Sequence, residues 1–177
     1  MGNIMEHNQQ IRFFNTMQRI LNRKEIKKVM EIIKSQWSAD VRLDYAFFIS
    51  GKDRIYIINK EIANFELGSL RINSVGLYFG EYTNGSLRLS IEGSQIIGRY
   101  AKKNIIEIDY ENARKWMNGQ TIEIKNNIGL EGFVILKNKN DFLGCGKAIL
   151  LNNAQEFSYK ILNYVPKNRR HSDNSVA

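Results

Sequence analysis

The chain has 177 residues, of which 43% are hydrophobic and 25% are charged, a balance typical of a soluble globular protein of one or two small domains. Its apolar runs are far shorter than the about 20 residues of a membrane-spanning helix, and the N-terminus lacks the apolar core of a secretory signal. A single cysteine excludes a disulfide framework and is compatible with a reducing cytoplasm.

The formal net charge is +8, from 26 basic and 18 acidic side chains. A positive field of this size favours polyanionic partners such as RNA, DNA or a membrane surface. The excess is shared equally between residues 1–100 and 101–177, and the one dense basic run is "PKNRRH" at 166–171. Charge therefore favours a nucleic-acid partner without indicating which surface would bind it.

Two segments near the N-terminus have helical periodicity. In "IRFFNTMQRIL" the apolar residues at helical spacing are Phe14, Met17, Ile20 and Leu21. In "NRKEIKKVMEIIKSQW", Asn22 followed three residues later by Glu25 predicts a capping box at the start of an amphipathic helix. The apolar stripe of this helix is Ile26, Val29, Met30, Ile33 and Trp37. We expect its opposite face to be solvated; that face carries Lys24, Lys27, Lys28 and Lys34.

The next segments favour antiparallel strands. "YAFFIS" and "RIYIIN" flank a short glycine-containing turn and predict a hairpin. "NKEIANFE" predicts a short helix, and Asn84-Gly85 predicts a type I′ turn in a second hairpin, because both residues tolerate positive φ. Ser90 is suited to cap a helix through "IEGSQIIGRYA", although Gly93 and Gly98 disfavour helix there.

The pattern changes after residue 102. "NIIEID" predicts a short strand, Asp109 is a candidate cap for the helix "YENARKWM", and Gly119 is a candidate left-handed residue that ends it. "QTIEIK", "GFVILKN", "FLGCGKAILLN" and "SYKILNYV" predict further strands, the last ending at Pro166. Short strands around one helix, without β-α alternation, favour a small mixed or barrel-like domain, with a boundary near residues 90–102.

The stretch "DFLGCGKAILLNN" at 141–153 contains two glycines and a lysine, so we tested it as a phosphate-binding loop. A G-x-x-x-x-G-K-[ST] motif anchored on Gly146-Lys147 would need a glycine where Asp141 stands and a hydroxyl where Ala148 stands. The dinucleotide motif G-x-G-x-x-G would need a glycine in place of Ile149. Both fail.

The cysteine of the same stretch lacks the partners of a catalytic nucleophile or a zinc ligand. A catalytic thiol needs a base, and the two histidines, His7 and His171, lie near the termini. Lys147 shares a strand face with Cys145 and could lower its pKa, but a small buried residue between glycines is the favoured interpretation. No Cys/His set for zinc is present in the sequence. Glycines inside this strand instead indicate a bulge, a barrel bend or a close backbone approach.

The second half of the chain resembles a PUA domain, a small β-barrel RNA-binding module. The similarity rests on "NIIEID", "ENARKWMNG", "GFVIL" and "FLGCGKAIL". The stretch from "DRIYIINKEIANFE" to "AKKNIIEI" also resembles the Nip-seven family of large-subunit ribosome biogenesis. The N-terminal helices do not match that family, and the tail is more similar to PUA domains of archaeal RNA-modifying proteins. A pre-PUA plus PUA arrangement attached to RNA methyltransferases is the alternative resemblance.

These resemblances imply an α+β fold. We expect an N-terminal α/β domain at residues 1–98, a PUA-like pseudo-β-barrel at 99–166 and a basic tail, expected to be flexible, at 167–177. PUA domains bind RNA through their helix, the glycine turn after it and their final strand. Carried onto this chain, the implied RNA-binding residues are Arg114, Lys115, Asn118, Gly119, Lys160, Asn163, Lys167, Arg169 and Arg170.

The physical chemistry of these residue types agrees with that assignment. Glycine at position 119 would let phosphate approach backbone N–H groups, and lysine and arginine supply salt-sensitive phosphate contacts. Tyr164 is a candidate stacking surface, with a core tyrosine as the favoured interpretation. For Arg169 and Arg170, an ordered contact and a disordered basic tail both stay open.

The sequence therefore predicts a non-catalytic RNA-binding protein of ribosomal RNA processing or large-subunit biogenesis, without cofactor or metal. The alternative is an accessory or adaptor subunit for an RNA-modifying enzyme such as a methyltransferase. Carboxylates such as Asp44, Asp53 and Glu107 show no catalytic pairing, and no methyl-donor glycine loop is visible. Expected partners are ribosomal RNA and an assembly factor or RNA-modifying enzyme, not a membrane. The expected location is the cytoplasm, or the nucleolus in a eukaryote; the composition hints at an archaeal source.

Overall fold

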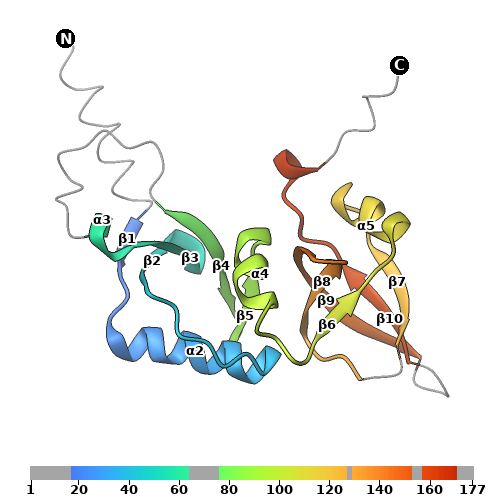
Figure 1. The fold of residues 1–177 in the computed structure, drawn as a ribbon, viewed down its shortest axis with the longest axis horizontal. Helices are drawn as coiled ribbons and strands as arrows, with labels where there is room; N and C mark the ends of the chain where they lie inside the picture. Colours follow the sequence, from blue (N-terminus) through green and yellow to red (C-terminus); the bar gives the residue numbers. More distant parts are fainter. Residues whose placement is uncertain (1–16, 64–75, 127–128, 153–156, 171–177) are drawn as a thin grey trace, which may run out of the picture.

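The computed structural model of the protein describes residues 17–63, 76–126, 129–152 and 157–170, and these residues build two five-stranded sheets (Figure 1). The first sheet has the order β1 (Met17–Ile20), β2 (Tyr45–Ser50), β3 (Arg54–Asn59), β4 (Leu77–Thr83), β5 (Ser86–Leu89). The second has the order β6 (Ile105–Glu107), β8 (Phe133–Asn138), β9 (Asp141–Asn152), β10 (Phe157–Leu162), β7 (Ile122–Asn126). The helices are α2 (Arg23–Trp37), α3 (Lys60–Ala63), α4 (Ile91–Gly98) and α5 (Tyr110–Met117), with 3-10 turns η1 (Gly51–Asp53) and η3 (Lys167–Arg169). Within these ranges, no helix combines the length and the apolar composition needed to cross a membrane.

The first sheet is antiparallel throughout, and both predicted hairpins are present in it. β2 and β3 pair in register from Tyr45↔Asn59 to Ser50↔Arg54. β4 and β5 are joined by Asn84 and Gly85, whose φ angles of 47° and 77° are those of the predicted type I′ turn. The short helix predicted at "NKEIANFE" is confirmed as α3 over Lys60–Ala63. Asn59 is the last residue of β3, and residues 64–66 lie outside the described residues.

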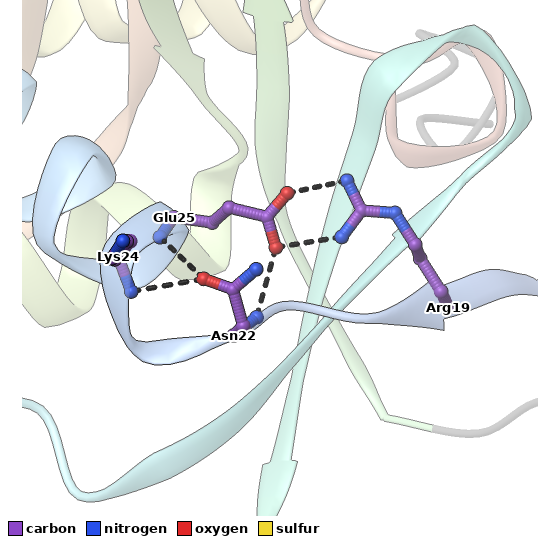
Figure 2. Close-up of polar contacts among 4 residues, drawn as sticks. All are labelled: Arg19, Asn22, Lys24 and Glu25. Atoms are coloured by element: carbon purple, nitrogen blue, oxygen red, sulfur yellow. Dashed lines mark hydrogen bonds and ion pairs between the residues drawn. The ribbon is translucent and has the colours of Figure 1, made fainter.

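Helix α2 begins with the predicted capping box (Figure 2). The Oδ1 of Asn22 accepts hydrogen bonds from the N–H groups of Lys24 (2.9 Å) and Glu25 (3.1 Å), and the Glu25 carboxylate accepts one from the N–H of Asn22 (2.9 Å). Arg19 of β1 donates two further hydrogen bonds to that carboxylate and lowers the Glu25 pKa to about 2. The pair thus keeps its charge down to strongly acidic pH and ties the end of β1 to the start of α2. The lysines predicted on the far face of α2 are exposed.

The helix predicted around Met17 to Leu21 is wrong. Met17–Ile20 is strand β1, which pairs antiparallel with β2, and the N–H of Leu21 donates to the Phe47 carbonyl at 2.8 Å. Leu21 is buried whereas Ile20 is 55% exposed. These apolar residues therefore form an edge strand and the residue after it, and they do not form the buried face of a helix. Pairing with a distant strand has overridden the local periodicity. Phe14 lies outside the described residues.

The second sheet is curled and mixes parallel and antiparallel pairs. β6 runs parallel to β8, while β8, β9, β10 and β7 are antiparallel neighbours. The predicted strands are all present, and the register of β8 against β9 shifts after Leu136↔Gly144, where Lys137 pairs with Phe142. This irregularity beside a glycine is the bulge that the sequence indicated. A curled sheet with one covering helix is the expected PUA-like half-barrel of an α+β protein (Figure 1).

Strand β8 of the second sheet contributes its two faces to two different cores. In β8, Phe133 and Ile135 belong to the apolar cluster that contains Trp37 and Phe47 of the first half. Val134 and Leu136 belong instead to the cluster around Trp116 of α5. Successive side chains of a strand point to opposite faces. Since a core covers each face of β8, all four side chains are buried. "GFVIL" is therefore a continuous apolar run, not an alternating one.

Helix α4 lies between the sheets and packs against both (Figure 1). Its predicted cap is confirmed, since the Ser90 Oγ accepts a hydrogen bond from the N–H of Gly93 at 2.9 Å. The two glycines that disfavoured a helix here permit close packing. A Cβ at Gly93 would lie 2.1 Å from the Phe79 carbonyl oxygen, and one at Gly98 would lie 2.3 Å from the Phe142 ring. The predicted boundary between residues 98 and 99 falls at the end of this helix and stays a prediction.

Substituting Gly93 tests this close contact. We expect Gly93→Ala to lower the free energy of unfolding by about 1–3 kcal/mol, the usual cost of overpacking, because the added methyl group collides with backbone and not with a movable side chain. Urea unfolding followed by tryptophan fluorescence measures the change.

Gly51→Ala is the matched control, because a Cβ at Gly51 meets no atom within 4 Å. We expect its unfolding midpoint to stay within experimental error of the wild-type value. Equal midpoints for Gly93→Ala and Gly51→Ala would contradict the packing of α4 against β4.

Candidate nucleic-acid interface

Helix α5 is fixed on the second sheet by its buried face. Asp109 caps it as predicted, accepting a hydrogen bond from the Asn112 N–H at 2.8 Å. Ala113 and Trp116 enter the core, and the Trp116 indole N–H donates to the Leu143 carbonyl of β9 at 2.9 Å. The outer face of α5, which carries Arg114 and Lys115, is exposed.

Gly119 ends α5 with φ of +83°, as the sequence predicted. The N–H of Gly119 donates to the Trp116 carbonyl (2.9 Å), and the N–H of Gln120 donates to the Lys115 carbonyl (3.0 Å). These two hydrogen bonds form a Schellman motif. The backbone N–H groups that phosphate was expected to approach are therefore engaged within the protein. The assignment of Gly119 to the RNA-binding surface stays a prediction.

Asn163, at the exit of β10, ties the C-terminal segment to α5. Its Nδ2 donates to the carbonyls of Trp116 (2.7 Å) and Gln120 (3.0 Å), and its Oδ1 accepts from the N–H of Val165 (2.7 Å). The side chain thus adds a hydrogen bond to the Trp116 carbonyl, which also accepts from Gly119, and binds the Gln120 carbonyl just after the helix. Asn163 and the helix end that holds Asn118 and Gly119 are brought together as predicted from sequence.

Tyr164 is a packing residue, as favoured from the sequence. Its ring contacts Phe133 of β8 with centroids 6.1 Å apart. The guanidinium of Arg88, from β5 of the first sheet, lies 4.4 Å from the centre of the same ring. Arg88 also forms an ion pair with Glu81 at 2.7 Å. Tyr164 therefore links the C-terminal segment to the first sheet through a cation–π contact.

The 3-10 turn η3, in the segment from Lys167 to Arg170, stands between α4 and α5 in the view of Figure 1. Arg169 forms an ion pair with Glu92 of α4 at 2.9 Å. Arg170 donates from Nε to the Val165 carbonyl at 3.1 Å, and its side chain lies over Gly119, where a Cβ would be only 2.3 Å from Nε. A guanidinium at the C-terminal end of α5 is also favoured by the helix dipole. Residues 171–177 of the predicted tail lie outside the described residues.

We call the exposed cations around the end of α5 the basic surface; they are Arg114, Lys115, Lys167, Arg169 and Arg170. Two of them have acidic partners, since Lys115 pairs with Glu111 at 2.7 Å and Arg169 pairs with Glu92. Among the described residues, the other three form no ion pair. This surface therefore has a net positive charge that the fold does not neutralise, which suits a polyanionic ligand.

Lys160 lies apart from the basic surface. Its neighbours in β10, Tyr159 and Ile161, are buried in the core beneath α5. Because side chains alternate along a strand, Lys160 points to the opposite, exposed face of the sheet, where its strand partners are Glu123 and Ile149. Lys160 and the basic surface could bind the same RNA only if that RNA reached both faces of the second sheet.

Sequence reasoning missed the acidic partner of this surface. Glu92 lies 77 positions before Arg169, in a different helix, and only its place in the first turn of α4 was visible from the sequence. Arg88 was missed for the same reason, since its contact with Tyr164 joins the first sheet to the C-terminal segment. No local pattern indicates such partners.

Cys145 is a small buried residue, as the sequence favoured. Its side chain is 3% exposed, and burial raises the pKa of the thiol to about 12. It faces the first core, whereas Gly144 and Gly146 lie on the other side of β9, where a Cβ at position 146 would be 2.7 Å from the Trp116 ring. The glycines thus make room for the indole, and the thiol is protonated at neutral pH.

Among the residues that the structure describes, no group of three or more His, Cys, Asp or Glu side chains is placed to hold a metal ion. A cleft of about 600 Å³ lies between α2 and the first sheet, lined by Leu21, Val29, Ile49, Ile55 and other residues. No predicted RNA-binding residue lines this cleft.

The helix, glycine turn, curled sheet and basic C-terminal segment define a PUA-like domain, which is an RNA-binding module. Residues 103–171 match the family described as the PUA domain of the methyltransferase RsmF. The match covers the second sheet, α5 and the whole basic surface, and it points to RNA as the ligand. No curated protein matches the chain.

The Glu92–Arg169 ion pair yields a prediction about affinity. Glu92→Gln should release Arg169 for contact with phosphate, so RNA should bind up to about fivefold more tightly. This factor corresponds to the about 1 kcal/mol that a partly exposed ion pair contributes at most. Fluorescence anisotropy with a labelled RNA oligonucleotide measures the dissociation constant.

Glu107→Gln is the control, because it adds the same charge away from the basic surface and frees only Lys137 of β8. Equal gains in both variants would show a general effect of net charge and contradict a specific role of Glu92.

Proposed function

We propose that the protein is a non-catalytic RNA-binding protein that acts on ribosomal RNA or on an intermediate of large-subunit assembly. The observation that carries the proposal is the basic surface of a PUA-like domain, on which three cations have no acidic partner among the described residues. Affinity would be mainly electrostatic, and any sequence preference would come from unpaired bases. The resemblance of residues 53–108 to the Nip-seven family supports the ribosomal assignment.

The first test neutralises the basic surface. A variant with glutamine at positions 114, 115, 167, 169 and 170 should lose on the order of a hundredfold in RNA affinity near physiological salt. The slope of its plot of log affinity against log salt concentration should become less steep by about 3 to 5, roughly 1 for each phosphate contact removed. The measurement is a salt series with structured ribosomal RNA fragments and an unstructured oligonucleotide.

The chain provides a control with the same change in charge. Five exposed cations lie on α2: Arg23, Lys24, Lys27, Lys28 and Lys34. Their replacement by glutamine removes equal charge far from α5 and should alter the salt slope much less. Equal losses in the two variants, or wild-type binding that neither variant changes, would contradict the basic surface as the RNA site.

A second candidate function is favoured by the description of the matched family, which names a methyltransferase. In this case the protein would be an accessory subunit that delivers RNA to a separate RNA-modifying enzyme.

This second candidate has its own test. Addition of the protein to an RNA methyltransferase catalytic domain should raise methyl transfer to RNA, and the five-glutamine variant should not. Thermal unfolding with S-adenosylmethionine should show no shift, because the donor would bind the partner enzyme. A clear shift of the isolated protein would contradict both candidates and indicate an enzyme.

A further inference from the structure

The exposed face of α5 carries an aromatic residue that the predicted RNA-binding set does not include. Tyr110 is the first residue of the helix, and its side chain is 77% exposed. The other exposed large hydrophobic residues of the described chain range from 36% to 55%. Tyr110 is thus much more exposed than any of these.

The fold gives no reason for a tyrosine at this position. The cap of α5 is supplied by Asp109, and the core contacts of the helix come from Ala113 and Trp116. Within the described residues, Tyr110 forms no side-chain hydrogen bond and no ring contact. An exposed aromatic ring with a polar hydroxyl is instead typical of surfaces that bind a partner.

The neighbour of Tyr110 on this face is an arginine of the basic surface. Arg114 follows at i+4, so the two side chains share one face of the helix, with Cβ atoms about 6 Å apart. Arg114 has no ion-pair partner among the described residues, whereas the adjacent Glu111 and Lys115 neutralise each other. The face thus presents a free ring beside a free guanidinium, on the helix whose other end is covered by Arg170.

We infer that Tyr110 is a stacking platform for an unpaired RNA base, with Arg114 binding the phosphate beside it. The inference rests on the proposed RNA-binding function and names the part of the RNA that this surface reads. A ring can stack on a base only where the base is not already stacked in a helix, so single-stranded loops or ends are the ligand class. Stacking is not ionic, so Tyr110 should contribute affinity that salt does not weaken.

The test compares Tyr110→Ala with Tyr110→Phe, and uses Tyr82→Ala of β4 (41% exposed) as a control on the first sheet. The probes are a single-stranded RNA oligonucleotide and a fully paired RNA duplex of equal length. Tyr110→Ala should weaken single-strand binding at least about fivefold, the lower end for one stacked base. Its salt slope and its duplex affinity should match wild type, and Tyr110→Phe and Tyr82→Ala should bind like wild type.

The outcomes separate this inference from the function on which it rests. A wild-type protein that binds neither probe overturns the proposed function and the stacking inference together. Wild-type binding that Tyr110→Ala leaves unchanged overturns the stacking inference alone. An equal loss on duplex and single strand, or a changed salt slope, also overturns it, because the ring would then act through the fold or the charges. A single 2-aminopurine in the oligonucleotide gives a second readout, since its fluorescence should be quenched by wild type and not by Tyr110→Ala.

Discussion

Burial of β8 on both faces is the constraint on which the rest of this structure depends. Phe133 and Ile135 complete the core of the first sheet, and Val134 and Leu136 complete the core under α5. A strand with two apolar faces must be covered on both sides, so the first half of the chain and α5 are held against opposite faces of the same short strand. Two cations of the basic surface, Arg114 and Lys115, lie on α5, and their position therefore depends on this double packing.

Glycines allow the close contacts by which α4 and α5 pack against the two sheets. Gly93 and Gly98 let α4 fit between β4 and β9, while Gly146 leaves space for the Trp116 ring. Trp116 in turn fixes α5 through the Leu143 carbonyl. The C-terminal segment then joins these parts, because Asn163 bonds to the end of α5 and Tyr164 reaches Arg88 of the first sheet.

The sequence predicted those features that depend on local chemistry. The capping box at Asn22, the turn at Asn84-Gly85 and the helix end at Gly119 each follow from side-chain or backbone properties within a few residues. Strand β1 could not be predicted in this way, because its conformation is set by pairing with β2. Similarly, the resemblance placed Asn163 beside α5, but Glu92 as partner of Arg169 and the isolation of Lys160 arise only from tertiary packing.

The packing of β8 into two cores also bears on how this PUA-like module can be passed between proteins. The matched range of residues 103–171 contains Phe133, Ile135 and Cys145, whose side chains fill the core of the preceding sheet. If this module were produced without the preceding sheet, it would expose these apolar side chains and would tend to aggregate. Recombination that moved this module to a new protein would therefore have to bring the preceding sheet along or replace these side chains with polar ones, so the two halves are expected to be inherited together.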